Sequence, residues 1–401
     1  MIALHTECRA CRSDRLERYL DLGVQAPANA LRHPEENGQP EFRAPLSVSW
    51  CAACGLSQLD HVVEPGILYR DYPFRAGVSQ LWRDHCEELL ASFETPARAF
   101  LIDIGSNDGT LLHVGVERGW TVLGVDPLPV ETRLPTIAAL WTPALAQGIA
   151  DRHGLADLIT ATNVFGHVDD ARAFLEGARE VLQPHGLLII ECPHIFPLLE
   201  QVAFDTIYHE HLSYWSLRPL ELLAESVGLK VIDVESFPDL HGGTMRYVLT
   251  PGDQRTSVAT AVTGLRILEA AQFTRGLAPY QDFTERVREQ VATTRDLLTT
   301  ARQAGQRIWG YGANAKSAVL LQTAGLTEAT VERLVDDAVS KQGLRTPGTH
   351  IPITTADDLA PADLIILFSW NNAMELKPKA RARGFRGRFF LPHPTPHIDG
   401  G

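Results

Sequence analysis

Between about residues 99 and 250, short apolar runs alternate with segments whose apolar residues recur at helical spacing. The short runs are typical of buried strands, and the periodic segments are typical of helices. This alternation predicts an α/β fold with a mainly parallel sheet and helices on both faces. The predicted strands are Phe100–Ile102, Val122–Val125, Leu158–Thr162, Leu187–Cys192, Val231–Val234 and Thr244–Leu249, and the predicted helices lie near Ala171–Leu182 and Pro219–Val227.

A second α/β unit is predicted closer to the carboxyl terminus. Residues Ser257–Ala304 have the pattern of long helix, interrupted near Pro279, and alternating strands and helices follow. The predicted elements after this helical stretch are strands at Arg307–Gly310, Val331–Val335, Leu364–Phe368 and Arg388–Leu391, and a helix at Lys316–Thr323.

The stretch Phe100–Leu112, FLIDIGSNDGTLL, joins a predicted strand to a helix through a loop bounded by two glycines. Gly105 and Gly109 allow the backbone to approach a ligand closely, and the helix start presents free N–H groups. Asp126 closes the next strand, where an acid can accept hydrogen bonds from ribose hydroxyls. The pattern predicts a nucleoside-type ligand; the alternative is an ordinary strand–turn–helix. The candidate cofactor-binding residues are Asp103, Gly105, Ser106, Asn107, Gly109, Asp126 and Asn163.

Polar and aromatic side chains follow two later strands of the same predicted sheet. His167 comes after one strand, and Tyr208-His209-Glu210-His211 comes after the next. Because the carboxyl ends of parallel strands meet at one edge of a sheet, we expect these side chains near the Gly105–Gly109 loop. They can supply a base, its orienting partner and an electrophilic contact. A metal site is the alternative, although HEH differs from the HExxH spacing of helical zinc sites.

Two CxxC pairs lie near the amino terminus, separated by 39 residues. Each pair supplies two thiolates from one tight turn, and two pairs complete a tetrahedral zinc site. Such a site has no spare ligand position, so we expect the zinc to be structural. The predicted ligands are Cys8, Cys11, Cys51 and Cys54.

Composition narrows the class of protein. The 401 residues are enough for two or three domains, and the net charge of -13 argues against nonspecific nucleic-acid binding. No apolar run approaches the ~20 residues that a membrane helix needs, and residues Met1–Cys8 carry no secretory or transit pattern. We therefore expect a cytoplasmic protein that binds neither nucleic acid nor membrane. We also expect a monomer whose partner is a small-molecule substrate.

The second α/β unit contains a glycine loop, Gly310-Tyr311-Gly312-Ala313-Asn314-Ala315. With Asp336 24 residues beyond Gly312, this GxGxxA loop formally fits a dinucleotide fingerprint. The alternative is a loop that binds phosphate or only packs.

Taken together, these motifs resemble those of the sugar C-methyltransferases that act on nucleotide-activated ketodeoxysugars. The resemblance covers nearly the whole chain and rests, in order, on CRAC…CAAC, DIGSNDGTLL, NVFGHVDD, FDTIYHEHLSYWS, HGGTMR, GYGANAK and KQGLRTPGTHIPI. It implies a zinc-binding domain at residues 1–75, and an S-adenosylmethionine-binding domain with a class I doubly wound sheet at 76–255. Linker helices and a Rossmann-like domain follow at 256–401. The family's C-terminal domain is not known to use NAD, which weakens the dinucleotide interpretation of the glycine loop.

The resemblance also implies roles in the site. His211 resembles the family's general base, and an aromatic position of the family's YxYxSS stretch corresponds to Tyr72, although this chain has Phe74 and lacks the serine pair. Asn314 replaces the proline usual in the family's GYGAPAK loop. The implied catalytic residues are His211, Tyr208, Glu210, His167 and Tyr72, and the implied cofactors are S-adenosylmethionine and a structural Zn²⁺.

The implied reaction begins when neutral His211 removes a proton from the carbon next to a ketone, and the enolate then attacks the sulfonium methyl. We expect Glu210 to raise the basicity of a neighbouring histidine and Tyr208 to donate a hydrogen bond to the enolate oxygen. The expected substrate is a ketodeoxysugar linked to a nucleotide, dTDP. Two other hypotheses are an NAD-dependent nucleotide-sugar oxidoreductase using the C-terminal glycine loop, and a non-catalytic scaffold. The HEH cluster argues against the scaffold.

Overall fold

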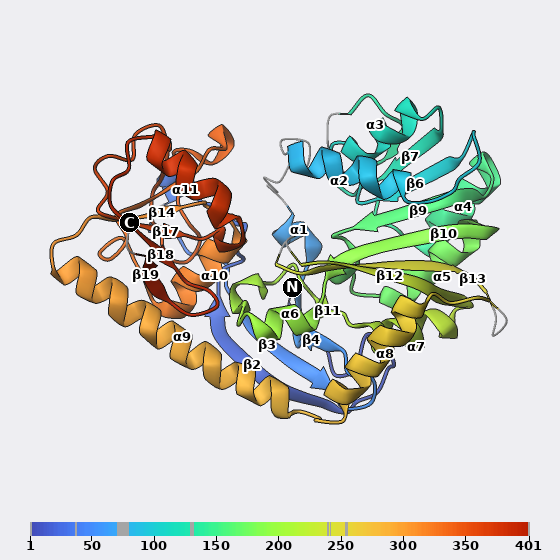
Figure 1. The fold of residues 1–401 in the computed structure, drawn as a ribbon, viewed down its shortest axis with the longest axis horizontal. Helices are drawn as coiled ribbons and strands as arrows, with labels where there is room; N and C mark the ends of the chain where they lie inside the picture. Colours follow the sequence, from blue (N-terminus) through green and yellow to red (C-terminus); the bar gives the residue numbers. More distant parts are fainter. Residues whose placement is uncertain are drawn as a thin grey trace.

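The computed structural model describes residues 2–36, 38–69, 80–128, 132–238, 240, 242–252 and 256–399. Within these ranges the strands form four sheets. Two α/β lobes lie side by side, and the amino-terminal strands run beneath both of them (Figure 1).

The central sheet has seven strands in the order β12-β13-β10-β9-β6-β7-β8. All neighbours pair in parallel except β13, which is antiparallel to both β10 and β12. The mainly parallel sheet predicted from the sequence is confirmed, with β8 as a short edge strand that the pattern missed. The strands are β6 (Phe100–Ile104), β7 (Thr121–Val125), β8 (Thr136–Ile137), β9 (Ala156–Thr162), β10 (Leu182–Pro193), β12 (Leu229–Phe237) and β13 (Thr244–Pro251).

Successive residues of the central strands point alternately into two hydrophobic cores, one on each face of the sheet, because side chains in a strand alternate between its two faces. Leu101 and Ile189 belong to the core that includes buried residues of α2 and α3. Their neighbours Ile102 and Ile190 belong to the core that includes α4, α5 and α7. Helices therefore cover both faces of the sheet. Their bounds are α2 (Gln80–Ala91), α3 (Thr110–Glu117), α4 (Pro143–His153), α5 (Ala171–Val181), α7 (Leu217–Ser226) and α8 (Thr260–Phe273).

The amino-terminal region forms a four-stranded sheet in the order β11-β4-β3-β2. Three of its strands come from the amino-terminal region of the sequence: β2 (Leu16–Gln25) and β3 (Ala44–Cys51) lead to the second CxxC pair, and β4 (Ser57–Leu59) follows it. The fourth, β11 (Ser213–Tyr214), comes from the distant segment that follows the HEH cluster, and it pairs antiparallel with β4. A small ladder of β1 (Ile2–Leu4) and β5 (His61–Val63) lies beside this sheet. The sequence pattern did not predict this sheet.

The carboxyl-terminal sheet has six strands in the order β16-β15-β14-β17-β18-β19, and only β19 is antiparallel to its neighbour. The predicted interruption of the helical stretch falls between α8 and α9, and Pro279 lies in the first turn of α9, where proline is tolerated. The elements are α9 (Ala278–Gln303), β14 (Ile308–Tyr311), α10 (Ala315–Ala324), β15 (Arg333–Val335), β16 (Ile353–Thr354), β17 (Leu364–Leu367), α11 (Ala373–Ala382), β18 (Arg388–Leu391) and β19 (His397–Asp399).

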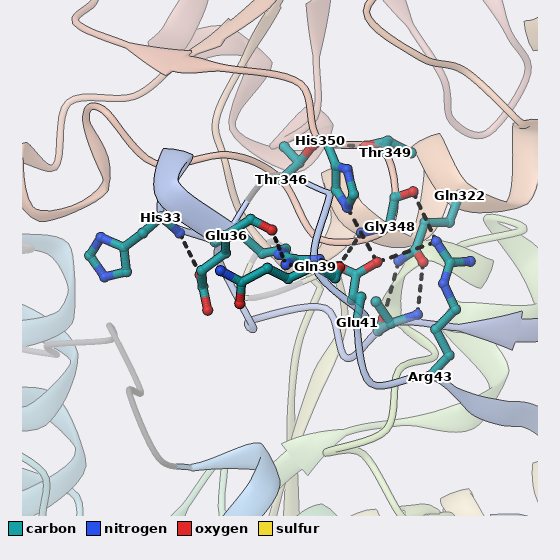
Figure 2. A network of polar contacts seen from close by, with 12 residues as sticks. His33, Glu36, Gln39, Glu41, Arg43, Gln322, Thr346, Gly348, Thr349 and His350 are labelled. Carbon is teal, nitrogen blue, oxygen red and sulfur yellow. Dashed lines mark hydrogen bonds and ion pairs between the residues drawn. The ribbon is translucent and has the colours of Figure 1, made fainter.

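The amino-terminal region also contacts the carboxyl-terminal lobe through polar groups (Figure 2). Glu41 accepts a hydrogen bond from the backbone N–H of Gly348 at 2.8 Å, and Arg43 donates to the carbonyl of Gly348 at 3.0 Å. The side-chain amide of Gln322 on α10 exchanges two hydrogen bonds with the backbone of Ala26, at 2.8 and 3.1 Å. The residues between the two CxxC pairs thus reach from the cysteines to the far lobe.

Two short helices, α1 (Pro65–Leu68) and α6 (Ile195–Glu200), lie in the middle of the molecule between the two lobes (Figure 1). A bilayer span needs about 20 apolar residues in one helix, and none of the helices within the described ranges meets that requirement.

Candidate active site

The glycine-bounded loop after β6 contacts the acid that closes β7. The backbone N–H of Asn107 donates to Asp126 Oδ2 at 2.9 Å, and the N–H of Gly105 donates to the carbonyl of Val125 at 2.7 Å. Gly105 has a φ of 75°, and a Cβ at this position would lie 2.2 Å from Val164 Cγ2. Glycine is therefore required here both by the backbone conformation and by the close approach of the next loop.

Two buried polar side chains line the start of this loop. Asp103 accepts a hydrogen bond from Thr160 Oγ1 at 2.7 Å, and burial raises the pKa of Asp103 to about 7. Ser106 Oγ is buried and has no hydrogen-bond partner within the described residues. Ser106 follows Gly105, where the backbone is open because there is no Cβ. A buried hydroxyl without a partner at this position is suited to hydrogen-bond a ligand that approaches the backbone. These residues therefore fit a nucleoside-type cofactor.

The loop after β9 lies against the glycine-bounded loop. Asn163 begins it with a φ of 58°, and its N–H donates to the carbonyl of Glu191 at 2.7 Å. Val164 is the residue that a Cβ on Gly105 would strike. The structure thus brings Asn163 and the loop residues of β6 and β7 to the same edge of the central sheet, as the sequence predicted for parallel strands.

His211 is oriented by a backbone carbonyl. Its Nδ1 lies 2.8 Å from the carbonyl oxygen of Thr206. Because a carbonyl can only accept, this bond places the proton of a neutral ring on Nδ1 and leaves the lone pair on Nε2. The ring packs on Tyr208, with centroids 3.9 Å apart and planes at 35°. Nε2 of His211 therefore has the protonation state that a general base needs.

His167 lies beside His211, with ring centroids 4.9 Å apart and an edge-to-face geometry. Its Nδ1 is 3.2 Å from the hydroxyl of Tyr69. Burial lowers the pKa of His167 to about 4, so this ring is neutral near pH 7. Tyr69 was missed by the sequence reasoning, which had no local signal for it. Tyr72, the predicted aromatic residue of this site, lies outside the described residues.

The other two members of the HEH cluster face the amino-terminal region. The Nε2–H of His209 donates to the carbonyl of Ala44 at 3.2 Å, and Glu210 Oε1 accepts from Asn29 Nδ2 at 3.0 Å. Burial raises the pKa of Glu210 to about 7. This geometry corrects our expectation that Glu210 raises the basicity of a neighbouring histidine, because the carbonyl of Thr206 orients the imidazole instead.

The four predicted zinc ligands lie together. Their sulfur atoms are all within 4.8 Å of one another, with Cys8 and Cys54 at 3.4 Å and Cys11 and Cys51 at 3.6 Å. A tetrahedral site with Zn–S bonds of about 2.3 Å places its sulfurs about 3.8 Å apart. The thiols therefore fit a zinc ion. Across the part of the chain that the structure describes, no other group of ligands meets the same criterion, so the HEH cluster is not supported as a metal site.

The acids near the C-terminal glycine loop are already paired with cations. Asp336 accepts from the N–H of Ala313 at 2.7 Å and lies 3.3 Å from the ammonium of Lys341. Asp337 pairs with Arg383. A dinucleotide site needs an acid that can accept from ribose hydroxyls, so these ion pairs weigh against the NAD-dependent alternative.

Comparison with known protein families divides the chain into three matched regions. Residues 8–69 match a zinc binding domain, residues 74–234 match a methyltransferase domain, and residues 239–394 match a C-methyltransferase C-terminal domain. The C-methyltransferase NovU from Streptomyces niveus is 33% identical over 413 aligned residues, which cover 98% of this chain and 96% of NovU.

Solved structures also resemble parts of this chain. The PH0226 protein from Pyrococcus horikoshii is 18% identical and covers 46% of this chain and 98% of its own, with a TM-score of 0.36. CalO1, a methyltransferase in calicheamicin biosynthesis solved with S-adenosylhomocysteine (SAH), is 17% identical and covers 46% of this chain and 57% of its own, with a TM-score of 0.33.

The family relationship rests on the near full-length match to NovU and on the three domains matched in order. S-adenosylmethionine is the cofactor of this enzyme, and the four cysteines hold a structural zinc. The chain belongs to the family of S-adenosylmethionine-dependent C-methyltransferases with an amino-terminal zinc-binding domain and a C-methyltransferase C-terminal domain.

Proposed function

We propose that this enzyme methylates the carbon next to the ketone of a nucleotide-linked ketodeoxysugar, with dTDP as the nucleotide. The motifs of the sugar C-methyltransferases, present along the whole chain, support the substrate class. The hydrogen bond from His211 Nδ1 to the carbonyl of Thr206 carries the mechanism, because it gives the ring the tautomer of a base. Within this proposal the zinc-binding, cofactor-binding and C-terminal domains occupy residues 1–75, 76–255 and 256–401.

His211 Nε2 removes a proton from the carbon next to the ketone in this mechanism. The imidazolium that forms keeps its Nδ1–H on the Thr206 carbonyl, which stabilises the added positive charge. His167 remains neutral because burial lowers its pKa to about 4. The neighbouring His167 ring therefore adds no positive charge that would oppose protonation of His211.

In this proposal Tyr208 acts on the oxygen of the ketone. Its ring packs on that of His211 with centroids 3.9 Å apart, so its hydroxyl belongs to the same site. A phenol donor directed at the developing enolate oxygen lowers the barrier to deprotonation. S-adenosylmethionine, when bound, supplies an electrophilic methyl group to the carbanion. Asp126 and the Gly105–Gly109 loop hold that cofactor in this proposal.

Solvent exchange tests the proposal directly. Deprotonation does not require the methyl group, so the wild-type enzyme with S-adenosylhomocysteine and a dTDP-ketodeoxysugar in D₂O should incorporate deuterium next to the ketone. His211→Asn should lose this exchange and about 10²–10⁴-fold in kcat, with S-adenosylmethionine affinity unchanged. If the variant exchanges at the wild-type rate but does not methylate, His211 is not the base. His167 or Tyr208 then becomes the leading candidate.

A further inference from the structure

Arg9 lies between two of the zinc ligands, Cys8 and Cys11, and its side chain is only 1% exposed. A buried guanidinium needs acceptors around it, because an unpaired buried charge is strongly unfavourable. The acceptors of the Arg9 side chain come from three segments far away in the sequence, and two of these segments each carry one of the two adjacent histidines.

The first acceptor follows His167. Arg9 Nε donates to Asp169 Oδ1 at 3.0 Å, and Asp169 is two residues after His167. The second acceptor follows His211: Arg9 Nη1 lies 3.4 Å from the carbonyl of Leu212. The rigid guanidinium fork therefore contacts the segments of both histidines at once.

The same guanidinium is fixed to the sheet of the zinc-binding region. Arg9 Nη1 also donates to the carbonyl of Leu59 at 2.9 Å, and the Arg9 backbone N–H donates to Gln58 Oε1 at 2.8 Å. The N–H of Leu59 in turn donates to the carbonyl of Leu212 at 2.9 Å, next to the pairing of β11 with β4. The segment of His211 is thus attached to the zinc-binding sheet both by backbone pairing and by Arg9.

We propose that Arg9 is a positioning residue that sets the placement of His167 relative to His211 and so connects the zinc site to the proton-abstracting site. The inference rests on the proposed function, in which the 4.9 Å ring separation belongs to the working geometry. Four sulfur ligands fix the turn that carries Arg9, and Arg9 fixes the two histidine segments. A structural zinc then contributes to catalysis without touching the substrate.

Arg9→Lys tests this inference, because lysine keeps the charge but loses the planar fork that spans several acceptors. Arg12→Lys is the matched control: Arg12 belongs to the same cysteine turn and lies 3.5 Å from Asp170, but half of its side chain is exposed. We expect Arg9→Lys to bind one zinc and to keep wild-type S-adenosylmethionine affinity and KM. Its kcat should fall by about 10- to 100-fold, because small misplacements of reacting groups are costly. Arg12→Lys should match the wild type.

Histidine ring signals give a readout that is independent of the substrate. In ¹⁵N-edited NMR spectra of the substrate-free protein, Arg9→Lys should shift the ring signals of both His167 and His211, and Arg12→Lys should leave them in place. Asp169→Asn, which removes the charge that Arg9 Nε contacts, should produce a smaller shift in the same direction, and it replaces Arg9→Lys if that variant does not fold.

Two outcomes overturn the inference. One is a folded, zinc-loaded Arg9→Lys protein with wild-type kcat and ring signals. The other is an Arg9→Lys protein whose loss of kcat equals its unfolded fraction, because Arg9 would then serve only to stabilise the fold. If the wild type fails to exchange or methylate the ketodeoxysugar nucleotide, the proposed function fails, while the ring signals still decide whether Arg9 positions the histidines.

Discussion

At the scale of single residues, the site is defined by contacts that sequence motifs do not encode. The motif Tyr208–His211 predicted a cluster, but not that His209 and Glu210 would face the amino-terminal region while His211 packs beside His167. Nor could the spacing of residues show that the carbonyl of Thr206 orients the ring of His211, because several nearby groups could accept the same hydrogen bond. The residue types of the site could be predicted from the sequence, but the direction in which each side chain points depends on the tertiary packing.

Glu210 leads to a prediction about pH. Its pKa is about 4.5 when unperturbed, and burial raises it to about 7 in the folded protein. The neutral carboxyl therefore contributes stability that is fully present below about pH 4.5 and is lost as the pH rises through 7. Glu210→Gln, a neutral isostere, should not lose this contribution. At pH 8 the variant should exceed the wild type in unfolding free energy by an amount on the order of 3 kcal/mol.

Urea denaturation of both proteins at pH 5 and pH 8 measures this difference. At pH 5 the gap should be much smaller, because Glu210 of the folded wild type is then still protonated. A gap of the same size at both pH values would contradict the raised pKa. The kcat at pH 7.5 is a second measurement. Glu210→Gln should lose less activity than His211→Asn, because Glu210 is bonded to Asn29 of the amino-terminal region and His211 is the proposed base.

At the scale of elements, the strands and helices with strong local patterns could be predicted, and those that depend on distant partners could not. β6, β7, β9 and β10 were found because each is a buried apolar run. β11 is only Ser213–Tyr214 and becomes a strand because β4 offers its edge. No local window contains that information. The loops at the carboxyl ends of the parallel strands could be placed together from topology alone.

The loop between β6 and α3 gives a prediction at the scale of elements. Asp126 accepts from the N–H of Asn107 and of Leu128 at 2.9 and 2.8 Å, so it shapes the loop. In the proposed function its remaining lone pairs accept hydrogen bonds from the ribose of the cofactor. Asp126→Ala should weaken S-adenosylmethionine binding by roughly 1.5–3 kcal/mol for each charge-assisted hydrogen bond lost.

Titration calorimetry measures that affinity, and Asp157→Ala is the control. Asp157 accepts from the N–H of Phe100 at the opposite end of β6, so its loss should lower stability and leave cofactor affinity unchanged. Equal affinity of the folded Asp126→Ala protein and the wild type would refute the ribose-binding role of Asp126.

At the scale of the whole molecule, the segment that carries His211, the proposed base, is held by contacts from all three parts of the chain. β11 pairs with the amino-terminal sheet, and Thr206 orients His211 from within the segment itself. On the other side, buried Asp205 accepts from Trp370 Nε1 at 3.0 Å, and His393 Nε2 lies at the same distance. If His211 is the base, as proposed, we expect proton abstraction to depend on the zinc-binding and C-terminal regions as well as on the methyltransferase domain.

Removal of the zinc should lower kcat far more than it lowers the affinity for S-adenosylmethionine. One Zn²⁺ per chain is expected, and Cys51→Ser should release it and destabilise the amino-terminal sheet, because metal binding free energy contributes to folding. β11 belongs to that sheet, so kcat should fall sharply. S-adenosylmethionine affinity should change little, because the Gly105–Gly109 loop and Asp126 directly follow β6 and β7 of the central sheet.

Metal analysis, calorimetry and kinetics on the same preparation test this prediction, with Cys86→Ser as the control. Cys86 is a buried thiol on α2, away from the four ligands, so its replacement should keep the zinc. Equal losses of kcat and cofactor affinity in Cys51→Ser would mean that the zinc supports the whole fold rather than the base-bearing segment. A wild-type protein without zinc, whose four thiols all titrate freely, would remove the structural site itself and with it the link from the cysteines through Arg9 to the histidines.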